Sequence, residues 1–321
     1  MRYPALASTL FLAACAGEQS SLDPAGPAAE SIHRLGIYMY VGATVVTLLV
    51  VGLMLAPLLH KGERAPNRKL FLWGGGVILP CVTLAMLLPL TFMTGGSMRA
   101  TPPEGAVRIE VTGHMFWWDV VYVQPDGARV RTANEMRIPV GEPVEIILKA
   151  EDVIHSFWVP SLAGKVDMIP GRTNRMTLQA DKAGVYRGQC AEYCGLQHAL
   201  MAFYVIATPR TDFDAWLAAL IPPRPEPATA ELIAGRELYT RIGCATCHEV
   251  RGVSDGRIGP DLTDVGSRRS IGAGALPGGL GSIAGWIAST QHLKPGANMP
   301  SYDQLSGPEL RAIAAYMDSL K

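Results

Sequence analysis

The chain has 321 residues, which is enough for two or three modest domains. Its formal net charge is zero, so the charge gives no indication of binding to nucleic acid. Hydrophobic residues make up 49% of the chain and charged residues 17%, a balance that favours a partly membrane-embedded protein. The cysteines indicate cofactor and processing chemistry rather than a disulfide scaffold. They are Cys15, Cys81 and the two pairs Cys190/Cys194 and Cys244/Cys247.

Residues 1 to 15 predict an export signal. Arg2 is followed by an apolar run that ends in small residues before Cys15, which is the pattern of a signal peptide. The ending Leu-Ala-Ala-Cys resembles a bacterial lipobox, which implies cleavage before Cys15 and lipidation of its thiol. The alternative is a plain signal peptide in which this cysteine is incidental. Residues 16 to 31, rich in Ser, Gly, Pro and Ala, are expected to form a flexible tether.

Residues 32 to 98 predict a transmembrane hairpin. Two uncharged runs, with spans at about residues 35–59 and 70–94, exceed the roughly 20 residues that cross the hydrocarbon core. The loop of residues 60–69 carries four basic residues against one acidic residue, Glu63. By the positive-inside rule this loop is cytoplasmic. We therefore expect the protein in a bacterial inner membrane, with its N-terminus and remaining domains on the periplasmic or outer side.

Residues 100 to 210 have the pattern of a β-sandwich. Apolar residues alternate in the segment Val107 to Val111, and Trp117 to Val123 is rich in aromatic and β-branched residues. The sequence Gln-Pro-Asp-Gly that starts at Gln124 then supplies a turn, with a fixed φ at proline and a permissive glycine. Several further short strands separated by turns complete the pattern of a two-sheet sandwich.

One short stretch within this domain predicts a metal site. Cys190, Cys194, His198 and Met201 follow one another at the spacing C-x3-C-x3-H-x2-M. Thiolate and thioether are soft donors that favour copper, and imidazole also suits it. The last three of these residues, with a distant histidine such as His155, would complete a site for a single copper. Because Cys190 adds a second thiolate that can bridge to a second copper, we interpret the stretch as a binuclear copper site.

The C-terminal region predicts a haem domain. Residues 221–228 form a Pro-rich, semi-rigid linker. Residues 229–321 contain Cys244-Ala-Thr-Cys247-His248, the attachment motif of c-type haem, in which both thiols bind the haem and the histidine binds the iron. A redox dithiol or half of a zinc site is the alternative. The flanking helical patterns indicate an all-α domain.

The second iron ligand is expected to be Met299, which precedes a proline as in a class I cytochrome c. Thioether ligation would raise the potential of the haem. His292 is the competing ligand. The segment around Pro260 resembles the one whose proline carbonyl hydrogen-bonds the iron-ligating imidazole in that family, which implies the same role here. Ser306 opens a final helix with a capping box.

Four segments of the first two-thirds of the chain resemble subunit II of haem-copper cytochrome c oxidases. They are Glu151–Phe157, Val159–Leu162, Ile169–Arg172 and Gly188–Cys190. Two spans followed by a cupredoxin domain are the layout of that family, so the resemblance covers residues 32 to about 210. The appended cytochrome c resembles the caa-type of these oxidases. The implied fold is two transmembrane α-helices, a cupredoxin-like all-β sandwich and an all-α cytochrome c domain.

The resemblance implies a CuA centre with a defined ligand set. Cys190 and Cys194 would bridge both coppers. His155 and Met201 would complete one copper, and His198 with the backbone carbonyl of Glu192 the other. In the family the carboxylate at the position of Glu192 also reaches a magnesium ion shared with subunit I. No residue of this chain is expected to act on oxygen directly.

One aromatic segment departs from the family pattern. Gly113 to Asp119 matches a stretch whose first aromatic residue is usually a tryptophan that accepts electrons from soluble cytochrome c, and here that position is Phe116. Trp117 or Trp118 would then take its place on the electron path. We also expect that a tethered haem does not need this docking patch, so that Phe116 is tolerated.

The implied function is electron transfer in a proton-translocating terminal oxidase. Electrons would pass from haem c through the binuclear copper to subunit I, where oxygen is reduced. Subunits I and III and an upstream electron donor are the expected partners. The alternatives are a membrane-anchored electron shuttle without an oxidase partner and a Sco-like copper chaperone. A quinol oxidase subunit shares the fold but lacks the copper ligands that this chain retains.

Overall fold

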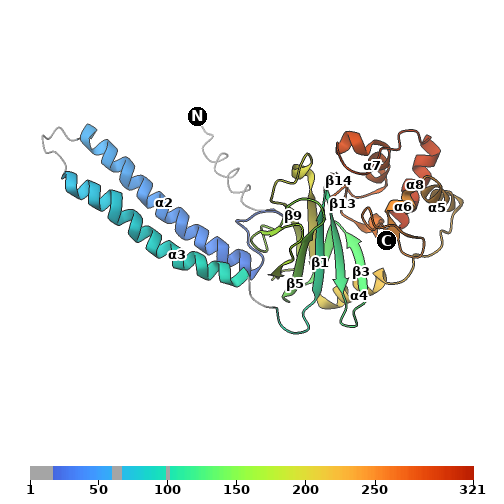
Figure 1. Ribbon diagram of the computed structural model, residues 1–321, viewed down its shortest axis with the longest axis horizontal. Helices are drawn as coiled ribbons and strands as arrows, with labels where there is room; N and C mark the ends of the chain where they lie inside the picture. Colours follow the sequence, from blue (N-terminus) through green and yellow to red (C-terminus); the bar gives the residue numbers. More distant parts are fainter. Residues whose placement is uncertain (1–16, 60–66, 99–101) are drawn as a thin grey trace, which may run out of the picture.

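The computed structural model describes residues 17–59, 67–98 and 102–321. A hairpin of two long helices is followed by a β-sandwich and then by a C-terminal helical domain (Figure 1). The hairpin extends from one side of the sandwich, and the helical domain lies on the opposite side (Figure 1). Cys15, the expected lipidation site, and most of the basic loop lie outside the described residues.

The hairpin consists of α2, Pro27–Leu59, and a second helix that begins as the π-helix η1, Leu70–Ile78, and continues as α3, Leu79–Met98. Their most apolar windows have mean hydropathy values of 2.3 and 2.1, and neither window is buried by protein. Both helices are long and apolar enough to cross a membrane. An apolar helix without protein cover requires another apolar environment, which a bilayer supplies.

Residues 17 to 29 lie against the sandwich, which differs from the flexible tether expected for residues 16–31. The Ala25 amide donates to the carbonyl of Ser161 at 2.7 Å. A Cβ at Gly26 would lie 2.2 Å from a backbone carbonyl oxygen of the sandwich, so only glycine fits there. The small residues that suggested flexibility instead allow the backbone to lie directly on the sandwich. The helix α2 begins at Pro27, before the predicted start of the first span at about residue 35.

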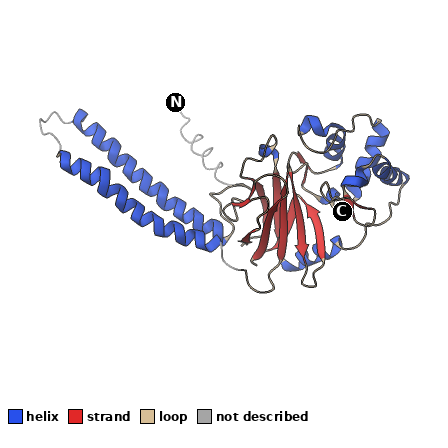
Figure 2. Ribbon diagram, in the orientation of Figure 1, coloured by secondary structure: helices blue, strands red, loops and turns tan. Residues whose placement is uncertain are grey.

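The sandwich is built from two five-stranded sheets (Figure 2). The first has the order β3-β2-β1-β5-β8, from Arg129–Ala133, Trp117–Val123, Arg108–His114, Val144–Ala150 and Asn174–Leu178. The second has the order β4-β10-β9-β6-β7, from Glu135–Pro139, Ala202–Thr208, Gly184–Cys190, His155–Trp158 and Val166–Met168. Alternating apolar residues from both sheets meet in one core, where Trp118, Phe157 and Phe203 pack ring against ring.

The helix α4, Arg210–Leu220, follows the sandwich, and an irregular segment leads to the C-terminal domain. This domain contains α5, Ala230–Arg241; α6, Cys244–Cys247; η3, Val265–Ser267; α7, Leu280–Leu293; and α8, Gly307–Ser319. Four short strands form two small hairpins: β11, Glu249–Val250; β12, Ser254–Asp255; β13, Ser270–Ile271; and β14, Leu276–Pro277. The capping box predicted at Ser306 is confirmed at the start of α8.

Charged side chains join the C-terminal domain to the sandwich. Arg131 of β3 has a side chain that is only 8% exposed, and it pairs with Asp119 at 2.6 Å and with Glu249 of the C-terminal domain at 3.5 Å. Thr132 Oγ1 donates to the carboxylate of Asp264, also across the boundary, at 3.1 Å. Charged side chains are tolerated in a buried position only when they are paired. The two domains therefore meet over a specific surface.

Candidate functional site

Strand ends and one loop bring the predicted copper ligands together. His155 begins β6, and Cys190 ends β9, which pairs with β6. The chain then forms a loop that contains Cys194 and the short 3-10 helix η2, His198–Leu200, before Met201 leads into β10. The Cys190 amide donates to the Met201 carbonyl at 2.9 Å, which closes the loop at its base. The sheet pairing thus positions ligands that are distant in sequence.

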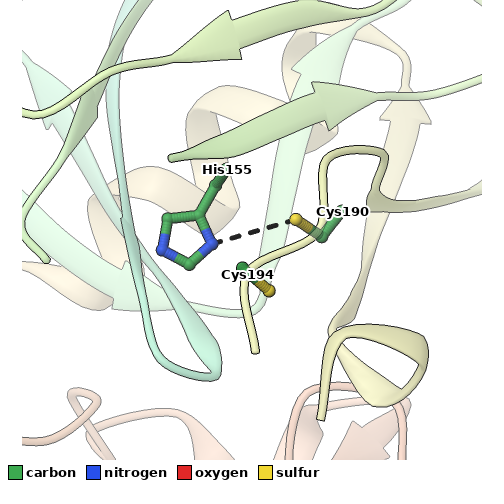
Figure 3. Close-up of side chains that lie close together, drawn as sticks. All are labelled: His155, Cys190 and Cys194. Carbon is green, nitrogen blue, oxygen red and sulfur yellow. Dashed lines mark hydrogen bonds between the residues drawn. The ribbon is translucent and has the colours of Figure 1, made fainter. Parts of the chain in front are cut away.

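The donor atoms form one buried cluster. The ligand atoms of His155, Cys190 and Cys194 all lie within 4.8 Å of one another, and Figure 3 shows the three side chains close together. His155 Nδ1 lies 3.8 Å from Cys190 Sγ, as the dashed line in Figure 3 marks. Cys194 Sγ lies 3.7 Å from His198 Nδ1 and 3.8 Å from the sulfur of Met201. All five side chains of the predicted set therefore meet.

The sixth donor of the predicted set is also in place. Cys190 Sγ lies 3.2 Å from the backbone carbonyl oxygen of Glu192. The Glu192 side chain itself is exposed, on the outer face of the loop. The backbone carbonyl of Glu192 therefore lies beside the thiol cluster, and its side chain is accessible from outside.

The two thiols share protons unequally. A hydrogen bond from Cys194 lowers the pKa of Cys190 to about 3, against the opposing effect of burial. The same bond raises the pKa of Cys194 above its usual range, and burial adds to this effect. One thiolate therefore forms readily, whereas the second proton is retained until something replaces it. A metal cation bound between the two sulfurs would replace this second proton, because cysteine binds metals as the thiolate.

Asp152 is a site residue that the sequence did not single out. Its carboxylate lies 2.8 Å from His155 Nε2. Burial raises the pKa of Asp152, but hydrogen bonds from His155 and from the Met115 and Val153 amides outweigh it and hold the pKa at about 2. An ionised carboxylate accepts a hydrogen bond from Nε2–H, which leaves Nδ1 as the unprotonated nitrogen that faces the thiols. Its only sequence signal was its position three residues before the histidine.

The donor set fits copper. Two thiols, two imidazoles, a thioether and a carbonyl oxygen converge in a buried cluster. Soft sulfur and imidazole ligands select copper over hard cations.

The C-terminal domain contains a pocket that fits a haem. Cys244, Cys247, His248 and Met299 all line it, together with apolar and aromatic side chains. His292, the competing ligand, is exposed and is not among the lining residues. The motif cysteines are unpaired, as covalent attachment to haem requires.

The imidazole of His248 is oriented by the predicted carbonyl. Its Nδ1 donates to the backbone oxygen of Pro260 at 2.7 Å. Burial lowers the pKa of His248 despite this bond. The ring is therefore neutral, with Nε2 free as a ligand atom, and its plane is fixed by the carbonyl.

The aromatic segment lies between the thiol cluster and the haem pocket. Met115, Phe116 and Trp117 line the pocket of the C-terminal domain. The ring of Phe116 also lies 3.4 Å from the position that a Cβ on Gly195 would take. Gly195 belongs to the loop of residues 190–201 that carries the predicted copper ligands, called the copper loop below. Trp118 is buried in the sandwich, with its ring centroid 6.2 Å from that of His155. The interface between the two domains therefore places the pocket directly over this segment, and the tolerance of Phe116 stays a prediction.

Comparisons with known proteins agree with this architecture. A family model described as the periplasmic domain of cytochrome c oxidase subunit II matches residues 120–208, and a cytochrome c model matches residues 232–321. Cytochrome c oxidase subunit 2 of Alkalihalophilus pseudofirmus is 38% identical over 333 aligned residues, which cover 98% of this chain and 94% of the relative. The chain belongs to the cytochrome c oxidase subunit 2 family.

Subunit 2 of Bacillus subtilis is 30% identical over 259 residues, covering 76% of this chain and 71% of that protein. Among solved structures, the periplasmic domain of subunit II of cytochrome oxidase from Bradyrhizobium japonicum is similar. It has 30% identity and a TM-score of 0.35, and the match covers 37% of this chain and 96% of that domain.

As a subunit 2, the chain transfers electrons in a cytochrome c oxidase and associates with other oxidase subunits. The family implies copper, and the cytochrome c domain implies haem. The two apolar helices anchor the protein in a membrane, and its folded domains are periplasmic. This membership excludes the Sco-like chaperone and the stand-alone shuttle.

Proposed function

We propose that this subunit 2 carries electrons from a covalently bound haem c to a binuclear copper centre of the CuA type, and from there to subunit I. The observation that supports it most strongly is the single cluster of six copper donors beside a haem pocket. The same aromatic segment borders both sites. A bridged copper pair would spread the transferred charge over two metals, so that little rearranges when an electron passes.

The proposed copper ligands act as the resemblance implied. Cys190 and Cys194 would hold both coppers; His155 and Met201 would complete one, and His198 with the Glu192 carbonyl the other. Buried Cys190 and Cys194 are enclosed by the sandwich, which keeps water from the thiolates. Asp152 orients His155 and holds its proton on Nε2. These residues keep the ligand geometry fixed between oxidation states.

In the haem domain we assign Cys244 and Cys247 to covalent attachment and His248 and Met299 to the iron. The Pro260 carbonyl sets the plane of the histidine ring, 2.7 Å from Nδ1. Thioether ligation raises the potential of a haem, which suits a donor to copper. Met299 lines the pocket and His292 does not, which supports the sulfur ligand.

The proposal extends to a magnesium ion, to further partner proteins and to the membrane in which the protein lies. The exposed carboxylate of Glu192 would share a magnesium ion with subunit I at the outer face of the copper loop. Subunit III and an upstream donor to haem c complete the assembly. We place the protein in the bacterial inner membrane, with residues 1–15 as a signal peptide and Cys15 as the lipidated residue.

Electron paramagnetic resonance of the purified protein tests the copper assignment. We expect hyperfine structure from two equivalent coppers in the wild type. His198→Ala should change that pattern because it removes a ligand, whereas His114→Ala should not, because His114 belongs to the same domain but lies outside the cluster. A single-copper pattern in the wild type would refute the binuclear site.

The haem assignment has a parallel test. Met299→Leu should remove the optical signature of thioether-ligated ferric haem, and His292→Leu should leave it unchanged because that histidine lies outside the pocket lining. A wild-type spectrum that lacks this signature, and that changes in His292→Leu but not in Met299→Leu, would make His292 the iron ligand. A spectrum unchanged in both variants would contradict either ligand.

A further inference from the structure

Lys294 is a buried cation at the boundary between the copper loop and the haem domain. It follows α7, and the residue is 1% exposed. Among the ion pairs of the described residues, none involves Lys294. Burying a charge without a counter-ion is costly, and lysine is almost never fully buried unless its group is satisfied otherwise. Its retention here requires a physical compensation.

The compensation is a complete set of hydrogen bonds to three separate segments. Lys294 Nζ donates to the carbonyl of Phe116 at 2.9 Å, to that of Leu200 at 2.7 Å and to that of Gly272 at 2.8 Å. These oxygens belong to the aromatic segment, the copper loop and the haem domain. An ammonium has three N–H donors, and each is used. Burial lowers the pKa of Lys294 to about 7, whereas three carbonyl acceptors require the protonated form.

Two further bonds surround this point and join the same segments. The side-chain amide of Gln197, in the copper loop, donates to the carbonyl of Pro295 at 2.7 Å. The amide of Ala202 donates to the carbonyl of Ala273 at 2.9 Å. Both residues are sequence neighbours of proposed copper ligands. Lys294 and its neighbour therefore hold the copper loop from the side of the haem domain.

We propose that Lys294 is a positioning residue for electron transfer between the two metal sites, because its ammonium fixes the copper loop and the aromatic segment against the haem domain. Lys294 also lines the haem pocket, so the same side chain touches the surroundings of both centres. The inference rests on the proposed electron path. Tunnelling rates fall steeply with distance, so a loosened contact here would slow the transfer without removing either cofactor.

The test compares Lys294→Met with wild type in the purified oxidase complex. Haem c is reduced rapidly, and the copper absorption and haem spectrum are followed in time. We expect wild-type copper and haem contents, an unchanged copper resonance spectrum and at least a tenfold lower transfer rate. Lys294→Gln retains two donors and should have an intermediate rate. The control is Lys165→Met, which removes an exposed lysine of the sandwich and should leave the rate unchanged.

A wild-type rate in Lys294→Met with both cofactors present would overturn the proposal. Loss of copper or haem in both Lys294 variants would also overturn it, because the residue would then be needed to build a site rather than to position one. Absence of any haem-to-copper transfer in the wild type would instead refute the proposed electron path, which separates the two failures.

Discussion

Substitution of Gly259 by alanine tests the assigned iron ligand most directly. Gly259 precedes Pro260 and lies against the ring of His248. A Cβ at this position would lie 2.6 Å from Cε1 of the imidazole and 2.9 Å from Nδ1. Ordinary contacts begin at 3.4 Å, so the ring or the loop must move by somewhat less than an ångström. The ring cannot move freely if it is bound to iron and to the Pro260 carbonyl.

The expected cost has two parts. Overpacking of a filled site costs about 1 to 3 kcal/mol, and loss of the hydrogen bond from His248 to Pro260 about 1 kcal/mol more. For a domain of this size each kcal/mol lowers the melting temperature by roughly 4 to 8 °C, so we expect a fall of about 8 °C or more in the haem domain. The potential of the haem should change as well, because the carbonyl tunes the ligand.

Gly285→Ala is the matched control. Gly285 lies in α7 of the same domain, and a Cβ there would meet nothing within 4 Å. Alanine stabilises a helix interior by roughly 0.5 to 1 kcal/mol relative to glycine, so this variant should melt slightly higher than the wild type. Thermal melts and redox titrations of both variants measure the difference. Equal melting temperatures and equal haem potentials would refute the assigned packing of His248.

Two other variants test the interface and the haem domain. Burial raises the pKa of Glu135 from 4.5 to about 7. Between pH 4.5 and about 7, the native state therefore retains a proton on Glu135 that the unfolded state has lost. Stability should therefore fall by up to about 3 kcal/mol as pH rises through that window. Glu135→Gln should remove this fall and melt higher at pH 8, and parallel melting curves from pH 5 to 8 would contradict it. Gly235→Ala places a Cβ 2.1 Å from the Ala312 carbonyl, where α5 crosses α8. This variant should destabilise the haem domain by about 1 to 3 kcal/mol, measured by calorimetry, and should leave the copper resonance spectrum unchanged. An unchanged melting temperature would show that the two helices separate easily.

Much of the fold could be predicted because its signals are local. Two uncharged runs longer than a bilayer predicted the hairpin, and alternating apolar residues with turn sequences predicted the sandwich. The capping box at Ser306 identified the start of the last helix correctly. The segment of residues 17–29 was misjudged, because composition alone does not distinguish a flexible chain from one whose small residues allow close packing. At Gly26 the absence of a side chain allows close contact between two backbone segments, and it does not serve conformational freedom.

The site was predictable where its residues are clustered in sequence. Cys190 to Met201 carry four donors in one loop, and the haem motif is contiguous. Asp152 and Lys294 gave no comparable signal, since a single carboxylate or ammonium is usually solvated on the surface. Lys294 lies 178 positions from Phe116, whose carbonyl it contacts. Only the folded arrangement of both domains reveals that the two meet.

The contact between the domains explains why so many charges are buried there. A short tether already provides the haem domain at an effective concentration of the order of millimolar, so affinity is not what the interface must supply. Removing one partner from a buried ion pair costs about 3 to 5 kcal/mol, because a charge is left uncompensated. A rotated domain would separate Arg131 from Glu249 and would take the carbonyls of Phe116 and Leu200 away from the Lys294 ammonium. The buried charges therefore select one orientation among many, and a single orientation is what a fixed distance between haem and copper requires.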